Sequence, residues 1–204
     1  MNARFQTPAL PHAIGEFVAD KGGYFAGLIA KADGIHALYL APKAEGELKG
    51  TWGKPGADLP GARSYHDGRT NTVAMAEAGS KLAKQALALH IGQHHDYHLP
   101  ARDELELLYR AFKPTEDENY TWRHGENPSA VPPTFPYTET SPAQTALDAF
   151  QADGAEAFEP AWYWSSTQYP AYTAWIQYFV VGLQYDVHKD VEYRARAVRS
   201  EVIG

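Results

Sequence analysis

The stretch Trp162–Ser200 reads WYWSSTQYPAYTAWIQYFVVGLQYDVHKDVEYRARAVRS, and it decides the fold that we expect. Neighbouring side chains on a β-strand point to opposite faces, so Trp175, Gln177 and Phe179 would share one face of a strand. The residues between them would share the other face. If the large aromatic side chains of the first set are buried, the second set lies on the outer face of the sheet.

We call the first set the frame residues: Trp162, Trp164, Ser165, Ser166, Thr167, Trp175, Gln177, Phe179, Gly182, Gln184, Lys189, Arg194, Arg196 and Arg199. We call the second set the gap residues: Tyr172, Thr173, Ile176, Tyr178, Val180, Val181, Leu183, Tyr185, Asp186, Val187, His188, Asp190, Val191 and Tyr193. An outer face rich in Tyr, Ile and Val is typical of a recognition surface, and the gap residues are therefore our predicted ligand-binding residues. The alternative is a core face of a second layer, in which Asp186, His188 and Asp190 would be costly to bury unpaired.

Two parts of the chain resemble a known family. The first combines WSST at Trp164–Thr167, AW-x-Q-x-F-x-x-G-x-Q at Ala174–Gln184 and RARAVR at Arg194–Arg199. The second is LPARDELELLYR at Leu99–Arg110. Both are similar to segments of the C-type-lectin-like domain of bacterial and phage proteins, which includes the variable proteins of diversity-generating retroelements.

The resemblance implies an α+β protein of C-type-lectin-like fold, with a short twisted antiparallel sheet, two or three helices and long irregular loops. In the retroelement family, adenine-directed mutation of AAY codons leaves NNY codons, which cannot encode Trp, Gln, Lys, Glu or Met. None of the gap residues is one of those types, whereas the frame holds Trp175, Gln177, Gln184 and Lys189. The resemblance therefore also implies that the gap positions are replaceable.

Composition excludes several classes of protein. The formal net charge of −7 argues against a nucleic-acid partner, because binding to the phosphate backbone needs a basic face. No apolar run is long enough for a membrane span, and the first residues lack a signal-peptide core. The chain has no cysteine, so packing must stabilise it without disulfides, and the cysteine chemistry of the formylglycine-generating enzyme, which shares this broad fold, is excluded.

The N-terminal half predicts a hairpin followed by a long connection. Residues 1–13 read as a flexible or oligomerising arm within a single domain of residues 1–204. Strands are expected at 24–31 and 35–41, with Asp33-Gly34 as the tight turn. Residues 43–70 are rich in Gly, Pro and charge, which is typical of an irregular connection, with Trp52 attached to the body of the domain.

Helices are expected in the middle of the chain. The first begins at Thr70 or Asn71 and ends at Gly79, and the second begins after Ser80 and runs to about residue 90. The third follows Pro100 and carries an apolar stripe of Leu105, Leu108 and Phe112 before Pro114 ends it, with Ala101 as a weak N-cap.

Towards the C-terminus, residues 115–140 show no clear period. A short helix is expected from Ser141-Pro142 to residue 150. Strands are expected at 162–165 and 193–199, with a hairpin about Val181-Gly182.

The segment His90–His98 holds the densest group of possible metal ligands. They are His90, His94, His95, Asp96 and His98. Imidazole and carboxylate groups suit zinc, but HHDYH has no known ligand spacing, so a structural or solvated role is favoured. A metal-dependent enzyme built on this segment stays open as the alternative function.

Three further groups of residues are assigned structural roles rather than catalytic ones. Ser165–Thr167 lacks the surroundings of a nucleophile, and its hydroxyls are expected to satisfy backbone groups in a bend. Glu104 and Glu106 lie two apart on a helix and are assigned to a solvated face. Arg194, Arg196 and Arg199 are assigned to salt bridges with the acidic helices rather than to an anion site.

The leading hypothesis is a non-enzymatic binding protein that displays a variable C-terminal region, residues 162–200, to a protein or glycan receptor on a host cell surface. A phage or prophage receptor-binding protein fits this best, made in the cytoplasm and associated with the virion tail, with no cofactor and with a homo-oligomer expected by family analogy. A structural tail component, with the C-terminal face buried against another chain, is the third reading.

Overall fold

A computed structural model describes residues 9–122 and 124–203. The arm predicted for residues 1–13 lies mostly outside the described residues, and its described part is attached to the fold. The His12 ring lies 5.9 Å from the ring of Phe25 and 6.2 Å from that of Tyr39, each edge to face. Across the described ranges, no helix is both long and apolar enough to cross a lipid bilayer.

The described residues form short strands and four helices. The strands are β1 (Phe17–Val18), β2 (Gly23–Lys31), β3 (Gly34–Leu40), β4 (Glu47–Thr51), β5 (Trp162–Tyr169), β6 (Thr173–Tyr178), β7 (Gln184–His188), β8 (Glu192–Arg196) and β9 (Val198–Ile203). The helices are α1 (Lys43–Gly46), α2 (Gly68–Glu77), α3 (Lys81–Leu87) and α4 (Arg102–Phe112). Short 3-10 helices lie at Ala19–Lys21, Pro60–Ala62 and Asp148–Phe150. The predicted α+β class is confirmed.

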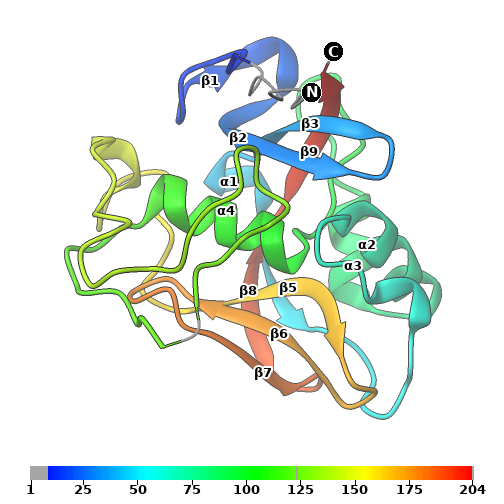
Figure 1. Ribbon diagram of the computed structural model, residues 1–204. Helices are drawn as coiled ribbons and strands as arrows, with labels where there is room; N and C mark the ends of the chain where they lie inside the picture. Colours follow the sequence, from blue (N-terminus) through cyan, green and yellow to red (C-terminus); the bar gives the residue numbers. More distant parts are fainter. Residues whose placement is uncertain (1–8, 123, 204) are drawn as a thin grey trace, which may run out of the picture.

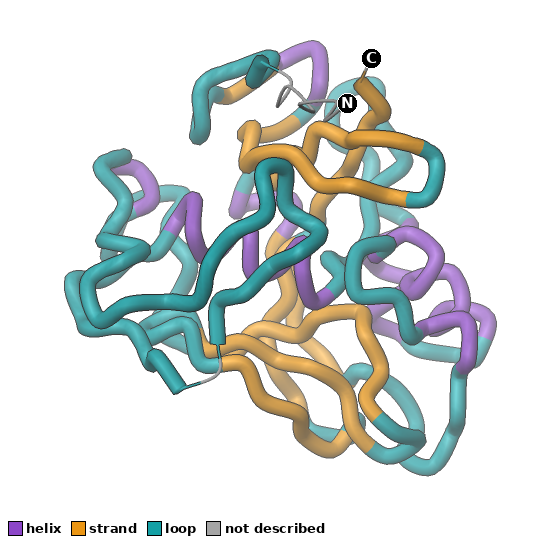
Figure 2. Tube along the Cα trace, in the orientation of Figure 1, coloured by secondary structure: helices purple, strands orange, loops and turns teal. Residues whose placement is uncertain are grey.

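The strands form two sheets. One sheet has the order β1-β2-β3-β9, and the other has the order β4-β8-β5-β6-β7. All pairs are antiparallel except β5 with β8, which run parallel. Figure 1 shows α4 between the two sheets, and Figure 2 shows that the chain between α4 and β5 is almost entirely loop.

Helix α4 supplies much of the core between the sheets. Leu105, Leu108 and Phe112 are buried there with Leu38 of β3 and Phe179 beyond β6. The stripe that predicted this helix is therefore the side that packs, and this prediction is confirmed. Because buried apolar area is the main favourable contribution to folding, α4 binds the two sheets into one packed unit.

The final predicted strand, residues 193–199, is wrong in one respect. The chain forms β8 and β9 with only Ala197 between them, and the two strands belong to different sheets. Ala197 donates its N–H to the Gly46 carbonyl, and its own carbonyl accepts from the Ala41 N–H. The sequence RARAVR alternates as a single strand would. It therefore gives no sign that β8 and β9 join different sheets.

Other boundaries differ from the expected ones. The β2–β3 turn is centred on Ala32-Asp33, since Lys31 pairs with Gly34. The connection at 43–70 contains α1 and β4, because β8 offers an unpaired edge to Glu47–Thr51. Helix α2 begins earlier than predicted, since the Asp67 side chain accepts from the Thr70 N–H at 3.1 Å and caps it.

One helix is shorter than predicted, and another does not form. Ser80 caps α3 as expected, but α3 ends at Leu87 instead of about residue 90. The helix expected from Ser141 to residue 150 is absent. In this described segment, the only helical turn is the 3-10 turn Asp148–Phe150. There the Gln144 side chain donates to the Pro114 carbonyl and holds the loop by a long-range bond.

The weak N-cap of α4 has a substitute. Ala101 has no side-chain acceptor, but the Thr167 Oγ1 atom of β5 accepts from the Arg102 N–H at 2.9 Å. The same hydroxyl donates to the Ser64 carbonyl at 2.8 Å. The Glu104 carboxylate completes the cap by accepting from the Ala101 N–H. A residue from another element thus does the work that Ser or Thr usually does at this position.

We expect Thr167→Val to destabilise the protein by about 1–2 kcal/mol, the usual cost of a lost helix cap. The substitution keeps the volume and removes the hydroxyl that joins β5, α4 and residue 64. Urea unfolding of the variant measures the loss. Thr140→Val, at an exposed loop position, is the control and should leave the midpoint unchanged. Equal midpoints for both variants would contradict the assigned cap.

Candidate functional site

The segment Ser165–Thr167 forms a bulge in β5 that shapes the larger sheet. Pairing with β6 shifts between Trp164 and Gln168. The Ser165 hydroxyl donates to the Trp175 carbonyl at 3.0 Å and accepts from the Thr167 N–H at 3.2 Å. The predicted scaffold role, in which hydroxyls satisfy backbone groups in a bend, is confirmed.

Several frame residues hold the sheet from inside. Gln177 is buried and donates to the Gly182 carbonyl and to Tyr137 Oη, at 3.3 and 3.1 Å. Phe179 stacks on Phe158 with ring centroids 4.0 Å apart. The β6–β7 hairpin therefore has a fixed backbone, which is what a display surface needs.

Lys189 holds the next turn. Its ammonium donates to the Ala57 carbonyl and to the Gln168 side chain, at 2.7 and 2.6 Å. It also lies 4.5 Å from the centroid of the buried Trp52 ring. Trp52 itself donates to the Ser165 carbonyl, so the predicted attachment of the connection through this residue is confirmed.

The gap residues differ widely in exposure. The exposed ones are Tyr172, Tyr185, His188 and Asp190. The half-buried ones are Thr173, Tyr178, Val180, Val181, Leu183, Asp186, Val187, Val191 and Tyr193. Ile176 is only 3% exposed and packs in one cluster with Trp52 and Trp164, so its expected place on an open face is wrong. The connection that carries Trp52 covers this part of the sheet.

Register divides the gap residues of β6 and β7 between two faces. Ile176 pairs with Tyr185 on one face, whereas Thr173 pairs with His188 on the other. Asp186 pairs with the frame residue Trp175 and so lies on that second face. The structure therefore does not gather the predicted site residues on one surface.

The open part of the first face is rich in aromatic side chains, and we call it the tyrosine face. It consists of Trp162, Tyr178, Tyr185, Val187 and Tyr193, which strand pairing and ring contacts place on one side of the sheet. Trp162 stacks on Tyr178 at 4.9 Å, and Tyr185 is 61% exposed on the edge strand β7. Large exposed aromatic side chains on a rigid backbone are typical of binding surfaces.

The second face carries an arginine that the sequence did not single out. The Arg102 guanidinium packs against the rings of both Tyr65 and Trp175, 5.0 and 4.7 Å from their centroids. Its guanidinium donates to the Gln184 side chain at 2.8 Å. No local pattern could reveal this group, because its members come from three separate parts of the chain.

The buried carboxylates of α4 overturn the assignment to a solvated face. Glu104 and Glu106 are 0% and 1% exposed. Glu104 Oε1 lies 2.8 Å from Lys31 Nζ, and the two side chains form a buried ion pair. Glu106 accepts from Arg110 and from the Asn127 amide. Burial raises the pKa of Glu104, but the Lys31 charge and His98 outweigh it and lower that pKa to about 2.

The arginines of the C-terminal segment form salt bridges, as predicted, but with other partners than the acidic helices. Arg194 pairs with Glu47 of β4, and Arg196 pairs with Glu156 in the loop before β5. Arg199 pairs through two nitrogens with the Asp96 carboxylate, at 2.9 and 3.1 Å.

The segment His90–His98 does not converge on a metal site. His94 Nε2 lies 2.9 Å from the Asp20 carbonyl, and the Asp96 carboxylate is engaged by Arg199. His98 is buried and faces Glu104. Within the described ranges, no group of three or more His, Asp or Glu residues is arranged to hold a metal ion.

Comparison of the sequence with models of known protein families finds no match, and comparison with curated protein sequences finds none either.

Proposed function

We propose that this protein is a non-enzymatic binding protein that presents the tyrosine face to a protein or glycan receptor on a host cell surface. The observation that carries the proposal is the exposure of Tyr185, at 61%, on a hairpin whose backbone is fixed by buried frame residues. Burial of a Tyr side chain against a partner provides much contact area at low cost in conformational entropy. Tyr172, 60% exposed at the neighbouring β5–β6 turn, extends the contact region.

The proposal includes the finer fold class. An α+β chain with two curled sheets around α4 and long loops is compatible with a C-type-lectin-like fold. The frame and gap pattern described above supports membership of the retroelement-diversified variable proteins. On this proposal the protein acts at a phage or prophage tail, and several copies together raise the avidity of weak single sites.

We expect Tyr185→Ala to weaken receptor binding by more than about 2 kcal/mol, or roughly 30-fold, as for a hot-spot residue. Because Tyr185 is exposed in the free protein, the variant should keep its stability. Binding of the purified protein to a panel of intact bacterial cells and to immobilised glycans measures the effect.

The matched control is Phe17→Ala, which removes an exposed aromatic side chain from β1 of the other sheet. It should bind as the unmodified protein does. Equal binding by Tyr185→Ala, or loss of binding with Phe17→Ala alone, would remove the tyrosine face from the contact surface.

A further inference from the structure

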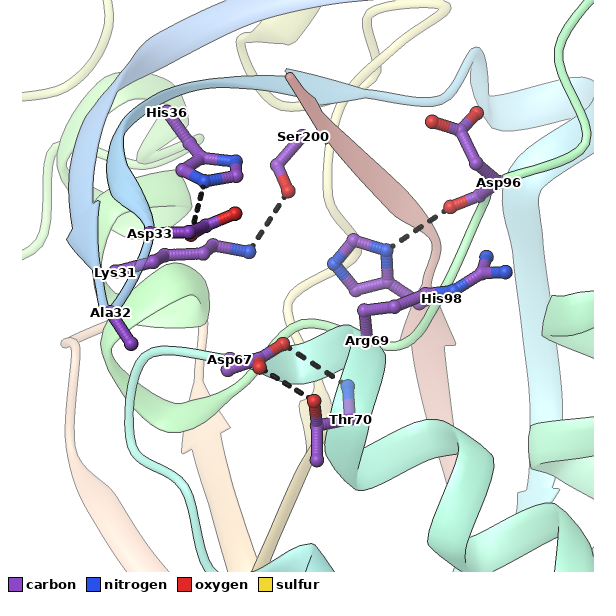
Figure 3. A pocket seen from close by; sticks show the side chains of 10 residues that line it. All are labelled: Lys31, Ala32, Asp33, His36, Asp67, Arg69, Thr70, Asp96, His98 and Ser200. Atoms are coloured by element: carbon purple, nitrogen blue, oxygen red, sulfur yellow. Dashed lines mark hydrogen bonds and ion pairs between the residues drawn. The ribbon is translucent and has the colours of Figure 1, made fainter. Parts of the chain in front are cut away.

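A polar pocket lies on the side of the molecule formed by the smaller sheet and α2, apart from the tyrosine face. It has a volume of about 430 Å³, within the usual range for small-molecule sites. Its walls are the β2–β3 turn, the start of α2, the loop before α4 and β9 (Figure 3). The lining side chains are almost all charged or polar, and no Phe, Tyr or Trp is among them.

Three carboxylates line this pocket, and each is held by a fixed donor. Asp33 Oδ1 lies 2.8 Å from His36 Nε2, and this hydrogen bond lowers the pKa of Asp33. Asp67 accepts from both the N–H and the hydroxyl of Thr70. Asp96 is engaged by Arg199, as described above. The pocket therefore holds ordered carboxylates, and a ligand that carries only negative charge would be repelled by them.

The cationic side chains of the pocket are not equivalent. Lys31 is only 6% exposed and is occupied by Glu104 and by the Ser200 hydroxyl at 2.9 Å. The Arg69 side chain, at the start of α2, is exposed and forms no hydrogen bond or ion pair with the described part of the chain. A guanidinium presents a planar pair of donors that matches a carboxylate, so Arg69 is the available anion-binding group.

His98 provides an independent sign of a ligand. The residue is 1% exposed, and its Nδ1 lies 3.3 Å from the Asp96 carbonyl. Its Nε2 has no hydrogen-bond partner and is 3.7 Å from Glu104 Oε2. Figure 3 shows this nitrogen turned toward the Lys31 side of the pocket. A buried polar atom without a partner costs free energy, which a bound ligand would recover.

We propose that this pocket is a second binding site and takes a small zwitterion of the α-amino-acid type. Figure 3 shows the Arg69 guanidinium on the Asp96 side of the pocket, so this exposed side chain swings inward to bind the ligand carboxylate. The ligand ammonium binds Asp33, whose Oδ2 is left free by His36. His98 lines the same pocket, with its Nε2 facing Glu104. A zwitterion satisfies both signs of charge in the pocket, and the lack of aromatic lining disfavours nucleobases and stacked sugar rings.

The test is isothermal titration calorimetry of the full chain with glycine, alanine, glutamate and lysine. Acetate and methylamine serve as probes that carry only one of the two charges. We expect at least one amino acid to bind, and both single-charge probes to bind at least tenfold more weakly. Arg69→Gln and Asp33→Asn should each weaken amino-acid binding at least tenfold. Both residues are exposed, so these variants should fold normally.

The control is Arg63→Gln, which alters another exposed arginine outside the pocket and should leave binding unchanged. The NMR chemical shifts of the His98 ring should change when the ligand is added, which provides a second measurement of binding at the pocket itself. The proposal is overturned if no amino acid binds at millimolar concentration. It is also overturned if acetate binds as well as glycine, or if Arg69→Gln binds as the unmodified protein does. Loss of the tyrosine face in Tyr185→Ala should not affect this titration.

Discussion

Glu104→Ala is expected to destabilise the protein by about 3–5 kcal/mol, because it leaves a buried Lys31 without its counter-ion. Two further contacts disappear with the carboxylate. The Ala101 N–H loses its acceptor at the start of α4, and the buried His98 ring loses the charge that it faces. Urea unfolding followed by circular dichroism measures the loss, with Thr167→Val as a milder lesion of the same helix terminus.

A double variant separates the ion pair from mere packing. Glu104→Leu combined with Lys31→Met removes both charges, and a buried pair replaced by apolar groups often costs little. We therefore expect the double variant to be more stable than Glu104→Ala alone. The opposite ranking would show that the uncompensated lysine is not the source of the instability.

The same pair gives a pH dependence whose sign is fixed. The pKa of Glu104 is lowered from 4.5 to about 2 in the folded state, so the unfolded chain binds the proton first as pH falls. The stabilisation is fully present above pH 4.5 and is lost between that value and about 2. Stability of the unmodified protein should fall more steeply over this range than that of the Glu104→Leu, Lys31→Met variant.

Arg196→Ala is expected to be about as damaging, at about 3–5 kcal/mol. The Arg196 side chain is fully buried and donates to the Ala41 carbonyl at 3.0 Å and to the Glu156 carbonyl at 2.6 Å. It also pairs with the Glu156 carboxylate. Removing the guanidinium leaves the Ala41 and Glu156 carbonyls without this donor, and it takes the counter-ion from the Glu156 carboxylate, at the point where β8 gives way to β9. The midpoint of urea unfolding measures the effect.

Arg63→Ala is the matched control, since its pair with Asp58 is exposed to solvent and its loss should leave the midpoint of unfolding almost unchanged. Arg196→Lys should recover only part of the loss, because one ammonium cannot reach acceptors on both sides as the guanidinium does. Full recovery with lysine would mean that charge alone matters at this position.

Local sequence patterns predicted the structural features that are determined by residues close together in the sequence. The apolar stripe of α4 and the cap at Ser80 were readable because each rests on residues within a few positions. The burial of Glu104 was not readable, because Lys31 reaches it from a hairpin distant in the chain. Thr167, the substitute cap, lies equally far from the helix that it serves.

The candidate site shows the same division. Alternation along β6 correctly separated Trp175 from Ile176, but it could not show that Trp52 covers the latter. Strand β4 was missed because its short charged sequence forms a strand only against the edge of β8. No local sequence pattern marked Arg102 or Tyr65 as part of a site, because the contacts of Arg102 with Tyr65 and Trp175 form only in the tertiary fold.

The joint at Ala197 has a mechanical consequence. Strand β9 pairs along its length with β3 and has one further bridge, between Val198 and His98, whereas β8 lies between β4 and β5. Tension applied at the C-terminal end of β9 would therefore break the hydrogen bonds of that strand one after another. The separation would stop at Arg196, whose buried guanidinium holds the end of β8. To extract β8 as well, the same force would have to break its pairing with β4 and with β5 at the same time. Damage to the smaller sheet would stop there and leave the aromatic surface of the larger sheet undisturbed.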